Sequence, residues 1–383
     1  MSKLKIFLIV VFLAQKIWAA AGQTEIATPV ELQNILTTNR QGAVVSLCGV
    51  APESCPRIPV SQTFSGGKLI FSDSPESPTN VGILCMDTNL AATGPSIPNR
   101  IFVYHVNASS SGKMKFCVLV ENNGNSAAVL TVHRAGVAGP GTDYMLIGET
   151  ALNRWLANSR TTAHSVAPGQ TIRLDTNFDS INVAHDGLLN GIWDYTFDQP
   201  HTIIICVLHA NDDPIAVGPT LGVLAGHVHD RGTFEYCNKD CSTTDGNINL
   251  ASAPREFPIG GNDDIYVKGW DNSVFPPIAV TNEGNYGVFY TVNLKLNADD
   301  SGALALLLSP QGGSWCGAVK AMPGLLPGGM FFVPSNQKSI SDPSSAVIVG
   351  EYFPRVLKNI SFQFMPSGGA SFPVYVLTVP FPK

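Results

Sequence analysis

The chain has 383 residues, of which only 14% are charged, and its formal net charge is −6. Because an ordinary soluble domain has roughly 25% charged residues, we expect a surface rich in Asn, Ser and Thr. The scattered charges form no basic stripe, which argues against nucleic acid and against polybasic docking to a membrane as partners.

The N-terminus has the pattern of a secretory signal peptide. Lys3 and Lys5 precede an apolar run over residues 6–14, and the small residues at 19–21 offer a cleavage point. An uncleaved anchor is the weaker interpretation, because the run is about half of the roughly 20 residues that a membrane span needs. We therefore exclude residues 1–21 from the fold and expect a secreted, periplasmic or cell-surface protein with no membrane insertion after cleavage.

Short apolar runs broken by turn residues dominate the rest of the chain. Residues 101–139 contain three such runs, separated by Ser/Gly and Asn/Gly turns, and residues 286–309 repeat the pattern. This spacing is typical of a meander in an all-β sandwich. We predict an all-β fold of one or two β-sandwich units related by duplication, with one short inserted helix.

That helix is predicted at about residues 142–157. A cap at Thr142 or Asp143 precedes an amphipathic stretch whose apolar residues recur at helical spacing up to Trp155. The chain length favours two domains. We place the first at residues 22–225, with the helix inserted in it, and the second at residues 226–383, which begins with a stretch rich in loops.

Eight cysteines in an exported chain predict disulfide bonds. Eight cysteines allow 105 connectivities, so spacing alone does not give the pairing. The pairs that spacing and strand position favour are Cys48 with Cys55, Cys237 with Cys241, and Cys117 with Cys206. Cys85 and Cys316 remain, either paired with each other or buried as thiols.

The candidate metal ligands are His227 and His229. On a strand, these two side chains project to the same face, as two ligands of one metal ion must. Together with the thiolates of Cys237 and Cys241, they would complete a tetrahedral zinc site. The competing interpretation is a disulfide beside two surface histidines, because exported thiols usually oxidise.

Acidic loops at residues 211–213, 262–264 and 297–300 are candidates for calcium, which exported β-modules bind through oxygen ligands. None has the EF-hand spacing, and Asn and Asp also serve turns by bonding their own backbone. The chain contains no G-x-S-x-G motif, so we assign no catalytic residue. A carboxylate pair for glycoside hydrolysis stays open, because tertiary distance defines it.

The candidate ligand-binding residues are Trp270, Lys268 and Asp271. Trp270 lies in a loop polar enough to expose its ring for stacking on a sugar, whereas a Trp in a sandwich is more often core or edge packing. Asn107 and Asn359 each begin an N-glycosylation sequon, which matters only if the host glycosylates exported chains.

Several phrases resemble exported bacterial proteins of unknown function, some of which are catalogued as copper-amine-oxidase-like. These phrases lie at residues 137–144, 231–234, 284–290 and 365–369. The resemblance implies an exported β-rich architecture. A copper amine oxidase also needs an Asn-Tyr-Asp/Glu motif before its His-x-His copper pair, whereas here Asn285 and Tyr286 precede Gly287 and follow His229. We therefore carry over no catalytic residue and do not expect amine oxidase activity.

The sequence thus predicts an exported, non-enzymatic β-sandwich protein that is a cell-surface, matrix or binding module for glycan or protein. The alternative is an exported metal-binding protein or enzyme that uses His227 and His229, with zinc, copper or calcium as the cofactor. A hydrolase with a carboxylate pair is the third class.

Overall fold

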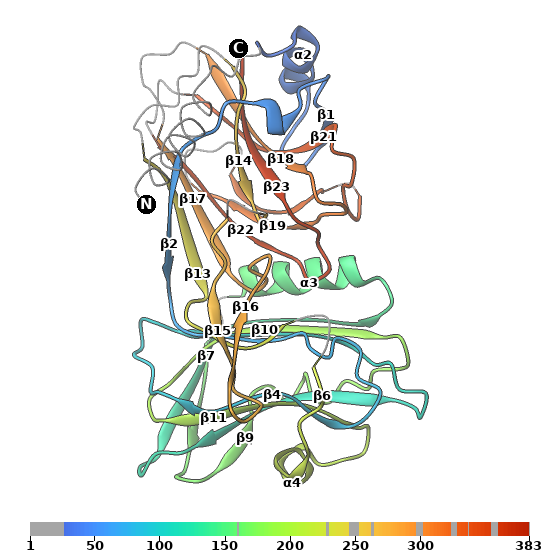
Figure 1. The fold of residues 1–383 in the computed structure, drawn as a ribbon, viewed down its shortest axis with the longest axis vertical. Coiled ribbons are helices and arrows are strands. Elements are labelled where there is room, and N and C mark those ends of the chain that lie inside the picture. The colour runs from blue at the N-terminus through green and yellow to red at the C-terminus, as the bar shows by residue number, and fades with distance from the viewer. Residues whose placement is uncertain are drawn as a thin grey trace, which may run out of the picture.

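The computed structural model describes residues 27–158, 161–226, 230–244, 253–261, 264–295, 302–322, 328–335, 337–353 and 359–382. The fold is all-β and sandwich-like, as predicted: four sheets carry the described chain, together with three short α-helices. The helices are α2 (Val30–Thr38), α3 (Tyr144–Ala157) and α4 (Pro214–Val217). Two sheets form each half of the molecule, and α3 lies between the halves (Figure 1).

The first half consists of an eight-stranded and a four-stranded sheet. The order of the eight-stranded sheet is β16 (Ile278–Thr281), β15 (Lys268–Asp271), β12 (Arg231–Phe234), β3 (Leu69–Ser72), β5 (Asn99–Val106), β10 (Leu188–Phe197), β7 (Ala128–Gly141), β8 (Thr162–Val166). The order of the four-stranded sheet is β4 (Gly82–Leu90), β11 (His201–His209), β6 (Met114–Asn122), β9 (Thr171–Arg173).

The second half consists of a six-stranded and a five-stranded sheet. The order of the six-stranded sheet is β2 (Val60–Ser65), β13 (Asn238–Thr243), β17 (Phe289–Lys295), β22 (Asn359–Pro366), β19 (Gly317–Ala321), β20 (Gly329–Val333). The order of the five-stranded sheet is β1 (Val44–Ser46), β21 (Ser345–Tyr352), β18 (Ala303–Pro310), β23 (Val374–Phe381), β14 (Arg255–Ile259).

Both halves have the strand order of a jelly roll. If β4 to β11 are numbered one to eight along the chain, the four-stranded sheet reads 1-8-3-6 and its partner contains 2-7-4-5. Numbering β14 and then β17 to β23 in the same way gives the same two orders in the second half. This is the double Greek key of a jelly roll. The predicted duplication is therefore confirmed at the level of topology.

The two jelly rolls exchange strands. Strand β2 comes early in the chain but pairs antiparallel with β13 of the second half, and β12 comes later but pairs antiparallel with β3 of the first half. Figure 1 shows β2 alongside β13. The exchange crosses the boundary expected near residue 225 in both directions, so each half of the molecule contains strands from both halves of the sequence.

Two cores lie between these layers. One fills the space between the eight-stranded and four-stranded sheets. The other, which is larger, fills the second sandwich and continues over α3 to the opposite face of the eight-stranded sheet. Trp155 of α3 is fully buried there and packs edge-on against Phe289. The helix predicted at about 142–157 is thus confirmed, and its apolar stripe joins the two jelly rolls.

In each jelly roll, a short helix covers the face of one sheet that points away from the core of the sandwich. Helix α2 packs Leu32 and Leu36 onto the five-stranded sheet, and α4 with its following turn covers the four-stranded sheet. The prediction missed α2, because its segment contains only two buried apolar residues among polar ones.

Two other expectations were wrong. Residues 101–139 form β5, β6 and β7, but β6 lies in the four-stranded sheet, so successive strands alternate between sheets and do not form a meander. The stretch expected to be rich in loops contains β12 to β15. These strands are four to six residues long, and sequence periodicity is weakest in such short runs.

The eight cysteines all lie in the described part of the chain, and none is bonded to another. Cys117 and Cys206 are directly opposite each other on β6 and β11, with their Sγ atoms 2.8 Å apart, so the predicted neighbours do meet. Cys237 and Cys241 do not, because Cys241 is on β13 and Cys237 immediately precedes that strand. Four residues of extended chain span about 13 Å, beyond the roughly 7 Å Cα limit of a disulfide.

Candidate functional site

The predicted ligand-binding residues lie on β15, where side chains alternate between solvent and interior. Lys268 and Trp270 are exposed, and the Trp270 side chain is 53% accessible. Asp271 points the other way: it is buried, and its Oδ2 accepts a hydrogen bond of 2.9 Å from Nε of Arg231. The carboxylate of Asp271 is therefore held inside the protein by Arg231 and is not presented to a ligand, contrary to its predicted role.

Trp270 lines a groove of about 780 Å³, which we call the Trp270 groove. Its lining residues come from four segments of the chain, at 66–68, 87–99, 233–236 and 270–272. Ligand sites of small molecules and cofactors commonly measure roughly 300 to 1,000 Å³, so this groove has the size of a ligand site.

A second aromatic ring faces the same groove. Tyr236 follows β12 and is 39% accessible. Its ring stacks on Phe64 of β2, with the centroids 5.9 Å apart and the planes 9° from parallel. This contact orients Tyr236, so the groove offers two aromatic surfaces, those of Trp270 and Tyr236.

Asp87 forms a preorganised polar floor. Its Oδ2 accepts hydrogen bonds from Oγ1 of Thr233 at 2.6 Å and from Nδ2 of Asn272 at 2.7 Å, and its Oδ1 accepts one from the backbone N–H of Asn89 at 2.9 Å. A carboxylate has about four lone-pair positions, so one acceptor position remains beyond these three bonds. Because Asp87 is held by three partners, its position does not depend on a ligand.

Two tight turns meet at one end of the groove. Gly66 in the turn from β2 to β3 has φ of +84°, and a Cβ there would come within 2.8 Å of the Cys237 sulfur in the turn from β12 to β13. Only glycine allows both the positive φ and this close approach. The Trp270 groove is therefore built where the two jelly rolls exchange strands.

Arg231 ties this region to the sandwich beneath it. Besides its ion pair with Asp271, its Nη1 donates to the backbone carbonyls of Leu84 at 3.0 Å and Leu224 at 2.7 Å. These bonds anchor β12 and β15 to β4, which carries the Asp87 floor. Asp271 thus supports the groove indirectly, as the buried partner of Arg231.

The predicted metal ligands His227 and His229 lie outside the described residues. Among the residues that are described, no group of three or more His, Cys, Asp or Glu side chains gathers as metal ligands would. The spacing along β13 also keeps the sulfurs of Cys237 and Cys241 too far apart to bind one zinc ion together.

The acidic loop at residues 211–213 serves turns. Asp212 accepts a hydrogen bond from the backbone N–H of His209 at 3.0 Å, and Asp213 accepts one from Ile215 at 3.0 Å as the cap of α4. Of the loop at 262–264 only Asp264 is described, and it pairs with Lys239. The loop at 297–300 lies outside the described residues.

The two sequons differ in accessibility. Asn107 is fully buried, and its Nδ2 donates to the carbonyls of Gly112 and Val183 at 3.0 and 2.8 Å. That nitrogen is not accessible for glycosylation in the folded protein. Asn359 begins β22 and is exposed.

No family model and no curated protein matches the chain. Among solved structures, it is similar to the T=3 Penaeus vannamei nodavirus, with 10% identity over 85% of this chain and 90% of that one and a TM-score of 0.16. It is also similar to the PBSX exported protein XepA, with 10% identity over 88% of each chain and a TM-score of 0.15. The STIV MCP has 9% identity over 84% of this chain and 96% of that one, with a TM-score of 0.15.

Likenesses with scores this low carry no argument, so the jelly-roll description depends on this chain's own strand order. One further property follows from the helices: in the described part of the chain, none has the length and apolar character to cross a bilayer.

Proposed function

We propose that this protein is an exported, non-enzymatic binding module of the cell surface or matrix, and that its Trp270 groove binds a neutral glycan. The observation that carries the proposal is the half-exposed Trp270 ring above a floor formed by the fixed Asp87 carboxylate. An exposed large aromatic inside a groove with ordered polar groups is the usual composition of a ligand site.

A sugar ring matches this composition. One face of a pyranose presents C–H groups that pack on an aromatic ring, while its edge presents hydroxyls that donate and accept hydrogen bonds. In the groove, Trp270 and Tyr236 supply the apolar surfaces. Asp87 supplies a fixed acceptor, with Asn89 and Asn272 beside it. A wholly apolar ligand would leave the acceptor on Asp87 without a partner, at a cost in binding free energy.

The charges around the groove favour a neutral ligand over an anionic one. Lys68 and the neighbouring Lys268 are matched by Asp87 and Glu235. With both signs represented equally, no field of one sign attracts a polyanion. We therefore assign the groove to neutral polysaccharides of the cell surface or matrix.

The experiment that tests this assignment is affinity electrophoresis of the full chain in gels containing a neutral glucan, mannan, xylan or galactan, followed by calorimetry with oligosaccharides of the retarding polymer. We expect retardation by at least one of them. Trp270→Ala should weaken binding about 10- to 70-fold, because half of a Trp surface contributes roughly 1.5 to 2.5 kcal/mol.

Phe275→Ala is the matched control. Phe275 is 98% exposed and lies five residues from Trp270, but it does not line the groove. This variant should bind as the wild type does. Absence of retardation by all four polymers would refute the proposal, and so would equal binding by the wild type and Trp270→Ala.

A further inference from the structure

Lys239 is a lysine in a fully buried strand position, where a lysine is rare. It lies on β13 of the six-stranded sheet, and its side chain is completely inaccessible to water. Its ammonium lies over the rings of Phe64 and Tyr290, with centroid distances of 5.2 and 5.4 Å. In the first jelly roll, the corresponding strand β3 places the apolar Ile70 in its core.

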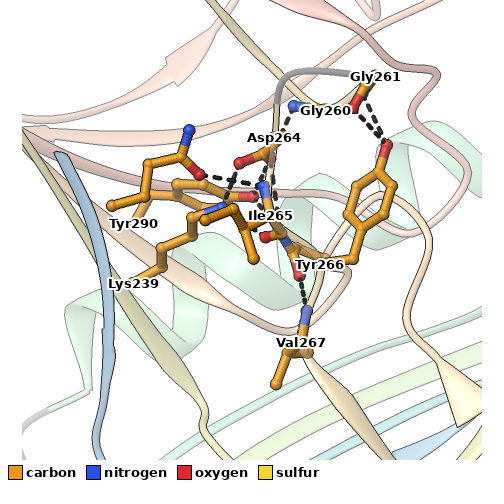
Figure 2. A network of polar contacts seen from close by, with 10 residues as sticks. Lys239, Gly260, Gly261, Asp264, Ile265, Tyr266, Val267 and Tyr290 are labelled. Atoms are coloured by element: carbon orange, nitrogen blue, oxygen red, sulfur yellow. Dashed lines mark hydrogen bonds and ion pairs between the residues drawn. The ribbon is translucent and has the colours of Figure 1, made fainter. Parts of the chain in front are cut away.

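The partner of Lys239 is the carboxylate of Asp264, in the loop between β14 and β15 (Figure 2). Nζ of Lys239 contacts Oδ1 of Asp264 and also donates to the backbone carbonyl of Ile265 at 2.6 Å. The Asp264 side chain is only 2% accessible. An amine and a carboxyl group are therefore held against each other where water does not compete.

The second oxygen of Asp264 is held by hydrogen-bond donors. Its Oδ2 accepts from the backbone N–H of Gly260 at 2.9 Å and from the hydroxyl of Tyr290 at 2.7 Å. Burial, and then the neighbouring Asp264 carboxylate, raise the pKa of Tyr290 well above its usual value, so the phenol stays protonated and donates. The two carboxyl oxygens thus have different surroundings: Oδ1 faces the amine and Oδ2 faces donors.

We propose that Lys239 and Asp264 condense into an amide, an intramolecular cross-link between β13 and the loop that follows β14. Nζ attacks Cγ of Asp264 after one ammonium proton passes to Oδ1. The Nζ–Cγ bond forms, the Cγ–Oδ1 bond breaks, and Oδ1 leaves as water with a second proton from Nζ. The third proton stays on the new amide nitrogen and keeps the hydrogen bond to the carbonyl of Ile265. No oxidant, metal or cofactor takes part.

Three features of the site favour this reaction. The reacting groups are fixed side by side, which removes the entropic cost of bringing them together. Gly260 and Tyr290 donate to Oδ2, on which negative charge develops in the tetrahedral intermediate. The closed core neither solvates the charged pair nor readily admits water to hydrolyse the product.

Peptide mass mapping of the full chain tests the proposal directly. Trypsin cuts an unmodified chain after Arg231, Lys239, Arg255 and Lys268. A cross-linked chain resists cleavage at Lys239, so we expect residues 232–255 joined to residues 256–268, at their summed mass less one water. Fragmentation should place the link on Asp264. Recovery of the free peptides 232–239 and 256–268 as the main species overturns the proposal, and so does a link to any other residue.

Variants test the roles of the individual groups. The double variant Lys239→Met/Asp264→Asn removes both charges, so the core keeps no unpaired ion. Because it lacks the tryptic site at 239, it should give the unlinked peptides 232–255 and 256–268. Lys320→Met changes an exposed lysine on β19 of the same sheet and should keep the link. Tyr290→Phe removes one donor to Oδ2, so linkage shortly after synthesis should be at least tenfold slower than in the wild type. Wild-type speed in this variant would contradict the role of Tyr290.

Discussion

The first and second jelly rolls have the same strand order but bury different polar groups. In the first, the buried polar side chains include two neutral imidazoles. His105 bridges Oγ of Ser72 and the carbonyl of Pro75, and His201 bonds the hydroxyl of Tyr195. Burial lowers the pKa of each histidine to about 4, so both are uncharged near neutrality. The second buries Lys239 against Asp264.

This difference shows two ways in which the same strand order accommodates buried polar side chains. A neutral group with both hydrogen-bonding positions occupied gives up little hydration, whereas a buried ion pair loses the hydration of two charges. A neutral imidazole does not react with its hydrogen-bond partners. An amine held against a carboxyl group can form an amide bond with it, and that reaction removes both charges from the core. The first jelly roll also buries two ion pairs, but their cations are the guanidinium groups of Arg100 and Arg231, which stay protonated in proteins. The cross-link is therefore proposed only for the second jelly roll.

Arg100 holds the two jelly rolls together, and its removal should have the largest effect. It forms two hydrogen bonds to Asp194 within the first jelly roll, at 2.7 and 3.3 Å, and its Nη1 donates to the carbonyls of Cys237 and Gly287 at 2.7 and 3.1 Å. Arg100→Met leaves Asp194 buried without a counterion. We expect a loss of about 3 to 5 kcal/mol in the free energy of unfolding, measured by chemical denaturation.

Two variants separate charge from packing in this prediction. Arg134 lies over the same Trp155 ring as Arg100, at 5.3 Å compared with 4.5 Å, but is less buried. Arg134→Met should therefore cost less than about 1 kcal/mol. Arg100→Met/Asp194→Leu removes both charges and should recover most of the loss. If the double variant is as unstable as Arg100→Met, the buried charge is not the cause.

Oxidation should distinguish the outer faces of the two jelly rolls. Under α4, Cys117 and Cys206 face each other across two strands, whereas the corresponding face under α2 packs aliphatic side chains from β18 and β23. We expect oxidised glutathione to join Cys117 to Cys206, which leaves six thiols titratable after unfolding. This Cys117–Cys206 disulfide should stabilise the protein by roughly 2 to 4 kcal/mol relative to its reduced form. Cys206→Ser should retain seven thiols under the same treatment, and a wild type that keeps all eight would contradict the prediction.

Glu149 of α3, the helix between the two jelly rolls, should make the free energy of unfolding depend on pH. This residue of α3 is 4% accessible, and its Oε1 has no hydrogen-bond partner among the described residues. Burial raises its pKa from 4.5 to about 8. The folded state therefore holds one more proton than the unfolded state between these values, so the free energy of unfolding falls as the pH rises from 4.5 to 8.

Glu149→Gln should remove this dependence, because its amide cannot ionise. We expect the free energy of unfolding of the variant to exceed that of the wild type by about 2 to 4 kcal/mol at pH 8 and to match it near pH 4.5, in denaturation curves at the two pH values. Glu235→Gln, at an exposed carboxylate, is the control and should follow the wild type. A wild-type slope in Glu149→Gln would assign the pH dependence to another group.

The all-β class, the duplication and α3 could be predicted from sequence because they depend on local pattern. Runs such as β11 are continuously apolar, and the stripe that ends at Trp155 repeats at helical spacing. The exposure of Trp270 was also predictable, from its polar neighbours. The pairing of β2 with β13 was not, because strand exchange joins residues about 175 apart in the chain and leaves no periodic signal.

The rest of the candidate site was hidden for the same reason. Asp87 and Tyr236 join Trp270 only through tertiary structure, and nothing in the sequence around either residue marks a groove. Asp271 was misassigned because its loop-like surroundings suggested exposure, whereas strand alternation turns it inward to Arg231. Lys239 gave no sign of burial, since lysine is almost always exposed and its neighbours are polar.

The smallest predicted effect concerns how the helix inserted in the first jelly roll is held by the second. Asp143 caps α3 by accepting a hydrogen bond from the backbone N–H of Leu146 at 3.4 Å, and it pairs with Lys338, which precedes β21. Asp143→Ala should cost about 1 kcal/mol in thermal or chemical unfolding, because a lost N-cap typically costs that much. Lys338→Met should cost less than about 0.5 kcal/mol, since the Lys338 side chain is 70% accessible and an exposed ion pair contributes little. If the two variants cost the same, the ion pair to the second jelly roll, and not the cap, determines how the helix is held.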